Sequence, residues 1–504
     1  MKKSTYKIAT FALVVVLVLS GCDKLKDFGS TNVDPSVTNT PNTSALLTSV
    51  LTGVGGFAGI ITPALYAQYY SETQYPDVSC YSANTVSPQI NYSGGGTATA
   101  PTNLANLEDL QNIIKTNTDA ATAATAALNG ANDNQIAIAR ILKAYIFWNM
   151  TDRWGDIPYS EALKGIPDVA YDTQESIYKD LLKELTEAVA QFTSGAPIKG
   201  DIAYNGDITK WQKLANSMRM LMALRLSKRY PNAGDYAATQ FNAALNDAAG
   251  AIATNADNFQ LTYPGGHFQN PFYVMYDGRH DYGESNTMTN LLGSFASDAR
   301  LSVFGATSAG APSTKGVPYG RARSAYSGWV GIDAWCGANA DYAYVLNPNF
   351  RAQTSPIFIV HAASVLLARA EAADRGWTTE NFATLYTQGI NTAYELWGLP
   401  DPAATYFAVA GVALGAKGTN LQQIATQEYI AYYPDGVQGW STWRRTNYPA
   451  LTPAIDGTNT PKVIPRRYMY GPSDYSLTAK GIATAVANLG SNGDKMDSRI
   501  WWDQ

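Results

Sequence analysis

Residues 135–154 carry apolar side chains at the spacing of one face of an α-helix. The side chains at i, i+3, i+4, i+7 and i+10 are Ile138, Ile141, Leu142, Tyr145 and Trp148. Gly155 suits the left-handed position after a helix, and Pro158 cannot continue one. The pattern therefore predicts a long helix that ends in the motif DRWGDIPY (152–159). We expect this motif to be structural, with Trp154 as a large buried anchor.

The same periodicity predicts further helices along most of the chain. Thr173 is placed to cap one of them, because its hydroxyl can accept a hydrogen bond from a backbone N–H in the first turn. The other predicted helical segments are 46–70 (two short helices broken at 53–59), 104–128, the stretch 171–192 with its cap at Thr173, 211–225, 236–252, 286–299, 357–375, 381–397 and 421–433.

Residues 255–350 have few periodic runs, many glycines and prolines, and many aromatic side chains. The carboxyl end after residue 433 also looks loop-rich. The expected fold is therefore mainly α, with antiparallel helix pairs and a long loop-rich insertion at about 255–350. No fixed 34-residue period is visible, so the pattern alone does not establish a tetratricopeptide array.

The first residues have the pattern of a bacterial lipoprotein leader. Lysines 2, 3 and 7 precede an apolar run at 8–19, which is short for a membrane-spanning helix. Leu19-Ser20-Gly21-Cys22 then matches a lipobox. We predict a signal peptide at 1–21, a flexible polar tether at 22–43 that starts at lipidated Cys22, and a single domain at 44–504. No later apolar run approaches 18 residues, so lipid is the only membrane attachment expected.

Composition narrows the function classes. Charged residues make up 15% of the 504 residues and the formal net charge is −5, which falls to −8 without the three leader lysines. No basic patch or RNA-binding motif is visible, so nucleic acid is not an expected partner. Plentiful Tyr, Trp, Gly and small polar residues are typical of a surface protein with long ordered loops. Whether Cys80 pairs with Cys336 is left open by the sequence.

Aromatic side chains in the loop-rich insertion are the main indication of ligand binding. A sugar ring packs its C–H face on an indole or phenol while its hydroxyls bind polar side chains. The residues predicted to stack are Trp329, Trp335, Tyr282 and Tyr344, and those predicted to make polar contacts are Asn339 and Asp341. The alternative is that these rings hold the loops on the scaffold.

Motifs for catalysis or metal binding are missing from the sequence. His267, His280 and His361 stand in no ligand spacing, and no GxSxG, P-loop or zinc motif occurs. No catalytic residue, metal or cofactor is therefore predicted, although a carboxylate pair that meets only in the fold stays open. The pairs Arg444-Arg445 and Arg466-Arg467 are expected to stack on aromatics and pair with carboxylates, and anion binding is the alternative.

Several motifs together resemble the SusD/RagB family of outer-membrane nutrient-binding lipoproteins. Besides the lipobox, they are DRWGDIPYSEA (152–162), YDTQESIY (171–178), GDITKWQKLANSMRMLMALRLS (206–227), LLARAEAADRGW (366–377), WRRTNYP (443–449) and IPRRYMY (464–470), in the family's order. The resemblance implies irregular tetratricopeptide-like helix pairs. It also implies a lipid-anchored protein on the exterior of the outer membrane, which lids a SusC-like TonB-dependent transporter.

The cargo implied by this resemblance is an oligosaccharide or, as the alternative, an oligopeptide. A surface hydrolase and a purely structural scaffold lipoprotein are the competing functions. Because the helix pairs form a rigid platform, the binding groups are expected on loops. The loops at 75–102 and 255–350 are predicted to converge into a shallow groove.

Overall fold

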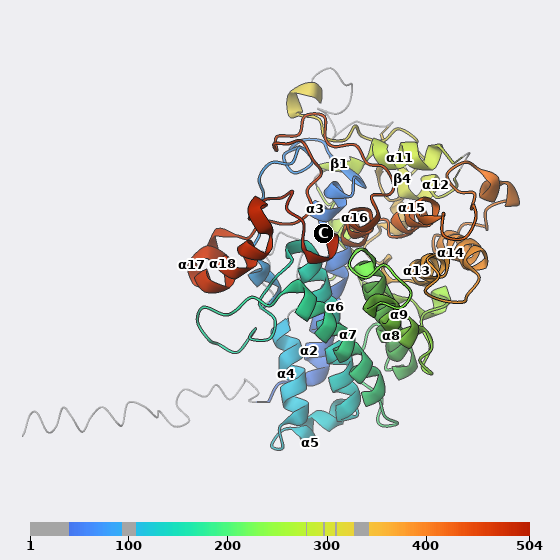
Figure 1. Ribbon diagram of the computed structural model, residues 1–504. Helices are drawn as coiled ribbons and strands as arrows, with labels where there is room; N and C mark the ends of the chain where they lie inside the picture. The colour runs from blue at the N-terminus through green and yellow to red at the C-terminus, as the bar shows by residue number, and fades with distance from the viewer. Residues whose placement is uncertain (1–39, 93–106, 279, 296–297, 308–309, 327–341) are drawn as a thin grey trace, which may run out of the picture. The chain divides into compact units, whose positions relative to one another are not determined.

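Antiparallel helix pairs make up most of the protein (Figure 1). The structure, a computed structural model, describes residues 40–504 except 93–106, 279, 296–297, 308–309 and 327–341. The longer helices are α2 (Thr43–Ala58), α4 (Leu107–Thr118), α6 (Asn132–Trp154), α7 (Gln174–Gln191), α8 (Ile208–Arg225), α9 (Tyr236–Leu245), α11 (Asn286–Gly293), α13 (Ala362–Asp374), α14 (Phe382–Leu396), α15 (Leu421–Ala431), α16 (Gly436–Thr446) and α18 (Ala479–Asn488). The shorter ones are α3 (Ile61–Tyr66), α5 (Ala123–Ala126), α10 (Pro271–Val274), α12 (Leu301–Phe304) and α17 (Pro472–Leu477).

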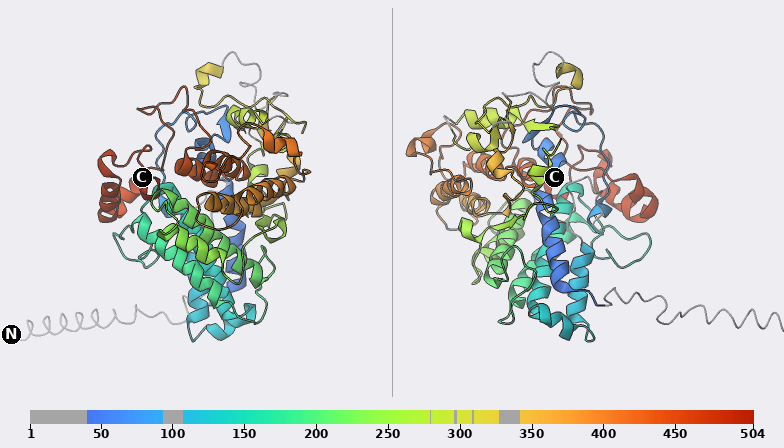
Figure 2. Two further views of the ribbon diagram at one scale, coloured as in Figure 1. Left: turned by 45° about the vertical axis from the view of Figure 1, so that its right-hand side comes forward. Right: turned by 180° about the vertical axis from the view of Figure 1, so that it is seen from behind.

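Successive helices pack on one another and bury their apolar faces between them. Helix α6 packs on α7, α7 on α8, α8 on α9, and α13 on α14. The two views of Figure 2 show α6 to α9 side by side, with α13 to α16 beside them. The prediction of a mainly α fold with helix pairs and a loop-rich insertion is confirmed.

The strands of the described residues form three short antiparallel ladders that join distant parts of the chain. The paired strands are β1 (Tyr70–Glu72) with β3 (Tyr282–Glu284), β2 (Phe259–Thr262) with β6 (Pro356–Val360), and β4 (Gly305–Ala306) with β5 (Tyr344–Val345). Each ladder contains at least one strand of the loop-rich insertion. The ladders therefore hold the insertion on the helical scaffold.

The DRWGDIPY motif forms a buried corner at the end of α6, as predicted. Gly155 has a φ of 92°, a conformation that a β-carbon disfavours, and its N–H donates to the carbonyl of Thr151. The Trp154 side chain is fully buried, and its indole N–H donates to the carbonyl of Val86 at 2.6 Å. Its ring lies edge-on to Tyr468, 5.0 Å between centroids. These contacts tie α6 to two distant loops.

Helix α7 also follows its sequence signals. Its N-cap is Thr173, whose hydroxyl accepts a hydrogen bond from the N–H of Ser176 at 3.2 Å. The apolar stripe expected from the sequence is buried, and it consists of Ile177, Leu181, Leu182, Leu185 and Val189. Local capping and periodicity are therefore sufficient to predict this element.

Helix α2 differs from the prediction, because it continues through the glycines at 53–56 and ends at Ala58. A β-carbon on Gly55 would collide with the hydroxyl of Tyr263 and the side chain of Ile357. The glycine therefore permits close packing of the β2–β6 ladder against the helix and does not break it. The segment Thr43–Tyr66 is long and apolar enough to cross a membrane, but half of its most apolar 18-residue part is buried inside the protein. Packing of α2 on α4 and α16 accounts for this composition.

Two further predictions at the carboxyl side are wrong. The apolar run from residue 357, predicted as helix, begins as strand β6, and α13 starts only after the N-cap His361. A short apolar run is compatible with either a buried strand or a buried helix. The segment around WSTWRRT, predicted as loop, is helix α16, capped by Asp435. Every residue of this helix is buried, and its polar side chains are paired inside the protein, so they mark no exposed face.

Candidate ligand-binding site

Loops from three distant parts of the chain meet at one end of the helical scaffold, near β1 and α11 in Figures 1 and 2. The rings of Tyr81 and Tyr319 lie 6.5 Å apart, which joins the first loop to the insertion, as the sequence predicted. The third segment, 447–463, was not expected there. An ion pair of 3.0 Å between Arg321 and Asp456 connects it to the insertion. The N–H of Thr458 donates to the carbonyl of Cys80, which connects it to the first loop.

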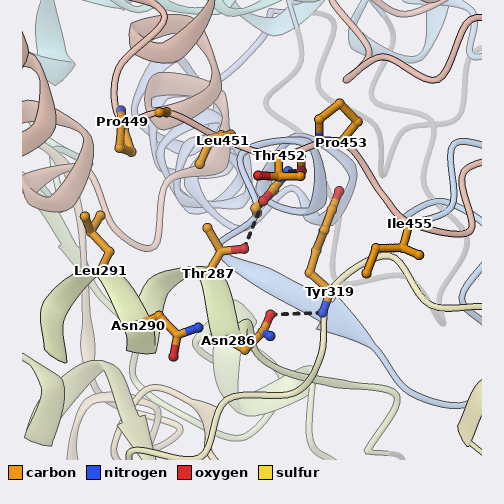
Figure 3. Close-up of a pocket in the computed structure, with 12 residues that line it drawn as sticks. Asn286, Thr287, Asn290, Leu291, Tyr319, Pro449, Leu451, Thr452, Pro453 and Ile455 are labelled. Atoms are coloured by element: carbon orange, nitrogen blue, oxygen red, sulfur yellow. Dashed lines mark hydrogen bonds between the residues drawn. The ribbon is translucent and has the colours of Figure 1, made fainter. Parts of the chain in front are cut away.

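A pocket of about 450 Å³ lies between α11 and this third segment (Figure 3). One wall consists of Asn286, Thr287, Asn290 and Leu291 on α11, and the other of residues 449–453 and Ile455. Gln68 and Tyr319 complete the lining. The volume is in the range of pockets that hold small ligands or one part of a larger ligand.

The two walls are held apart at a defined distance by Gln68. Its buried side chain donates to the carbonyl of Thr452 at 2.7 Å and accepts a hydrogen bond from the hydroxyl of Thr287 at 2.9 Å. The backbone of Gln68 has a φ of 58°, which is uncommon for a residue with a β-carbon. Since one side chain bridges both walls, the pocket is organised before any ligand arrives.

Tyr319 and Asn286 secure the base of the pocket. The hydroxyl of Tyr319 donates to the carbonyl of Leu65 at 2.7 Å, and its backbone N–H donates to the side-chain oxygen of Asn286 at 3.0 Å. Helix α11 itself begins at the N-cap Ser285, whose hydroxyl accepts from the N–H of Thr287. The polar wall is therefore part of a regular element and keeps its orientation.

The lining is amphipathic and uncharged. The apolar part consists of Leu291 on α11 and of Pro449 and Leu451 on the opposite wall, and Ile455 is 61% exposed at the rim. Among the described residues, no Asp, Glu, His, Lys or Arg lines the pocket. The same part of the chain contains no cluster of His, Cys, Asp and Glu that could hold a metal ion. Such a lining is suited to binding a neutral ligand with both apolar and polar groups.

Of the six residues predicted to bind ligand, the structure describes two, Tyr282 and Tyr344. Tyr282 lies half-buried in β3, and its carbonyl accepts a hydrogen bond from the hydroxyl of Tyr276. Tyr344 lies in β5 and is 3% exposed, with its ring edge-on to Tyr276 at 5.1 Å and to His280 at 5.4 Å. Neither residue lines the pocket. The other four, Trp329, Trp335, Asn339 and Asp341, lie outside the described residues.

Sequence reasoning missed the pocket residues themselves. Asn286 and Asn290 are four residues apart on a helix, so they share a face, but this spacing is common on exposed helices. Leu451 stands in the stretch Pro-Ala-Leu-Thr-Pro-Ala-Ile (449–455), which has no helical or strand period, so no local pattern marks it as a pocket residue. The structure adds these residues to the predicted aromatics.

The arginine pairs stabilise the core, as the packing interpretation predicted. The guanidinium of Arg444 stacks on Trp440, 3.6 Å from the ring centroid, and burial lowers its pKa to about 9. Arg445 pairs with Glu371 and Glu428. Arg466 pairs with Asp503, and Arg467 with Asp494. These arginines are therefore engaged within the protein and do not form an open anion site.

Cys80 is a buried free thiol, and Cys336 lies outside the described residues.

Glu284 lies two residues before helix α11, which forms one wall of the pocket. Its side chain is fully buried, and neither of its carboxyl oxygens has a hydrogen-bond partner in the described structure. Burial raises its pKa well above the ordinary value of 4.5. The carboxyl is therefore protonated in the folded protein at neutral pH but ionised in the unfolded chain. Folding takes up this proton, so the stability that Glu284 permits is complete below about pH 4.5 and is lost as the pH rises toward the folded pKa.

Glutamine is neutral and has the same shape as a protonated glutamate. We therefore expect the free energy of unfolding of Glu284→Gln to fall less steeply with rising pH than that of the parent. The slope should fall by up to about 1.4 kcal/mol per pH unit. Urea denaturation of both proteins at pH 5, 7 and 9 measures it. Equal slopes in the parent and the variant would show that Glu284 is ionised in the folded protein.

Comparisons with known proteins agree with this fold. No curated protein matches the chain. Among solved structures, a chitin-binding protein is 28% identical, with a TM-score of 0.71, over 92% of this chain and 100% of that one. A chitin-binding SusD homolog from Flavobacterium johnsoniae is 24% identical, with a TM-score of 0.68, over 92% and 98%. A SusD homolog from Parabacteroides distasonis is 21% identical, with a TM-score of 0.74, over 92% and 98%.

A protein-family model also matches most of the chain. Residues 35–471 match the model of the SusD-like family, which is described as starch-binding and associating with the outer membrane. This range includes the helix pairs, the loop-rich insertion and both walls of the pocket. The chain therefore belongs to the SusD-like family of carbohydrate-binding, tetratricopeptide-like proteins that associate with the outer membrane.

Proposed function

We propose that this protein binds oligosaccharides at the cell surface and passes them to a SusC-like TonB-dependent transporter. The observation that carries the proposal is the preorganised, uncharged and amphipathic pocket on the loop side of the scaffold. Sugars present apolar C–H faces and hydroxyls together, which such a lining complements. The family description as starch-binding and the 28% identity to a chitin-binding protein support a carbohydrate ligand.

The proposed role is binding without catalysis. The pocket offers amides, hydroxyls and apolar groups, and none of its described lining residues has a carboxylate or imidazole to transfer protons. We keep Tyr282, Trp329 and Trp335 as proposed stacking groups and Asn339 and Asp341 as proposed polar contacts, and we treat the buried Tyr344 as support for the loop-rich insertion. Oligopeptides remain the alternative cargo, because aromatic loops also pack peptide side chains.

Calorimetry on the mature protein, made soluble by Cys22→Ala, tests this function. We expect weak binding of an oligosaccharide from a glycan panel, with at least about tenfold loss of affinity for Leu451→Ala, Trp329→Ala or Trp335→Ala, since each loses apolar contact with the sugar. Leu128→Ala is the matched control, because Leu128 is 70% exposed and does not line the pocket. Binding of peptides but of no glycan would contradict the carbohydrate assignment, and turnover of a bound glycan would indicate a hydrolase.

The anchor is tested separately. We predict that Cys22→Ala leaves the protein unlipidated and soluble, because no thiol remains to accept lipid at the end of the leader. Fractionation of cells that lack the transporter measures its distribution between the outer membrane and the soluble fraction. An unlipidated variant that still sediments with the outer membrane would contradict lipid anchoring at this residue.

A further inference from the structure

The pocket lining indicates which kind of sugar it accepts. A bound carboxylate or sulfate needs cationic or multiple N–H donors, and a protonated amine needs carboxylates or several acceptors, because burying an unpaired charge is costly. No charged side chain lines the pocket among the described residues. The charged pair that borders the pocket segment is already engaged, since Arg321 contacts Asp456 at 3.0 Å and the N–H of Ala322 donates to the same carboxylate. The pocket therefore favours an uncharged group.

Asn290 provides a polar side chain of the pocket that is available to a ligand. Its side chain is exposed and lies on α11 beside Leu291, and Figure 3 draws no hydrogen bond to it from the other lining residues. The neighbouring amide of Asn286 already accepts the N–H of Tyr319, and Thr287 is engaged by Gln68. A side-chain amide carries both a donor and an acceptor, so it can pair with another amide through two hydrogen bonds.

Apolar groups stand next to this amide. Leu291 belongs to the same helix turn, and Leu451 and Pro449 face it from the opposite wall (Figure 3). A sugar hydroxyl at this position would form a hydrogen bond with the Asn290 amide but would make no apolar contact with Leu291, Leu451 or Pro449. A planar amide that ends in a methyl group would use both parts, with the methyl buried against the leucines.

We propose that the pocket holds the acetamido group of an uncharged, N-acetylated sugar. Asn290 pairs with the N–H and C=O of the acetamido group, and Leu291 and Leu451 receive its methyl. This inference rests on the proposed carbohydrate-binding function and names the sugar class that the same site selects. The specificity comes from the Asn290 amide. An acetamido group pairs with it, whereas a sugar without that group leaves it without a hydrogen-bond partner.

Three hexamers with the same β-1,4 linkage separate the contributions by calorimetry. They are built from N-acetylglucosamine, which is neutral with an amide, from glucose, which is neutral with a hydroxyl, and from glucosamine, which is cationic. We expect the acetylated hexamer to bind the parent protein at least about tenfold more tightly than either of the others. Equal affinities, or tighter binding of the glucose or glucosamine hexamer, would overturn the proposal.

Asn290→Asp converts the amide to a carboxylate of nearly the same shape. We expect it to weaken binding of the acetylated hexamer and to strengthen binding of the cationic one, so that the ratio of the two affinities falls by at least about tenfold. Asn381→Asp is the matched control, because Asn381 is exposed, caps α14 and does not line the pocket. Thermal unfolding confirms that both variants are folded.

The outcomes distinguish the two proposals. An unchanged ratio in a folded Asn290→Asp variant would show that Asn290 does not contact the acetamido group. If none of the three hexamers binds while another glycan of the panel does, the sugar class is wrong and the carbohydrate-binding function stands. If no glycan binds at all, the function itself fails.

Discussion

Trp154→Ala is expected to lower the free energy of unfolding by about 3–5 kcal/mol, the range for removing a large aromatic side chain from a core. The ring is fully buried at the end of α6, edge-on to Tyr468. The guanidinium of Arg153 lies 4.5 Å from the ring centroid. The substitution leaves a cavity and an unsatisfied carbonyl on Val86, and it removes the nearest of the three rings around the Arg153 guanidinium.

Urea denaturation followed by circular dichroism measures this loss. Trp154→Phe is the matched control, because it keeps most of the apolar surface and loses the indole N–H, so its cost should be clearly smaller. Native domains are stabilised by about 5–15 kcal/mol, so the alanine variant should still be folded in dilute buffer if the parent lies in the upper part of that range. A variant of full stability that no longer binds ligand would instead show that the motif takes part in binding.

Arg445→Met is expected to cost a similar amount, about 3–5 kcal/mol at pH 7, because it leaves buried carboxylates without their cation. Arg445 on α16 pairs with Glu371 on α13, and at 2.8 Å with Glu428 on α15. All three side chains are buried. Methionine fills similar space but supplies no charge. Among the described residues, the ion pair that remains for the two carboxyl groups is that of Glu371 with Arg375, at 2.7 Å.

The pH dependence of this loss identifies its cause. Burial alone would raise the pKa of Glu371, but the charges of Arg445 and Arg375 outweigh it and lower that pKa. The stability that this pairing supplies is present above the unfolded pKa of about 4.5 and is lost as the pH falls toward the folded value. Burial and repulsion from Glu371 raise the pKa of Glu428, so this carboxyl already carries a proton over much of the neutral range.

Urea denaturation of the parent and Arg445→Met at pH 7 and pH 4 tests this reasoning. The difference in unfolding free energy should be smaller at pH 4, where Glu371 in the variant takes up a proton. Lys183→Met removes an exposed partner of Glu187 on α7 and should cost no more than about 0.5 kcal/mol at either pH. A deficit that is the same at both pH values would assign the loss to packing and not to the unpaired charge.

The sequence alone determined the helix ends and caps of this protein, because these depend on residues that are close together in the chain. The helix ending at Trp154 and Gly155 and the cap at Thr173 were predictable, because helical periodicity and capping act within a few residues. The packing role of the arginine pairs was also predictable, since nearby aromatics and a low overall charge left little reason for an open anion site. The order of the motifs was sufficient to indicate the family.

The tertiary structure alone decided the elements that depend on distant contacts. Every residue of helix α16 is buried, so its polar side chains do not mark an exposed face, and β6 is recognisable as a strand only when β2 lies beside it. The glycines of α2 look like a helix break until Tyr263 fills the space that a side chain would occupy.

The pocket is the clearest case of this kind. Asn290 and Leu451 lie far apart in the chain, and Gln68, which bridges the walls, belongs to a third segment. Each of these residues is unremarkable in its own stretch of sequence, because an exposed amide on a helix and a leucine in a loop have no period to identify them. Only the hydrogen bonds and ion pairs between the loops bring them together, and these connections are not encoded in any local pattern.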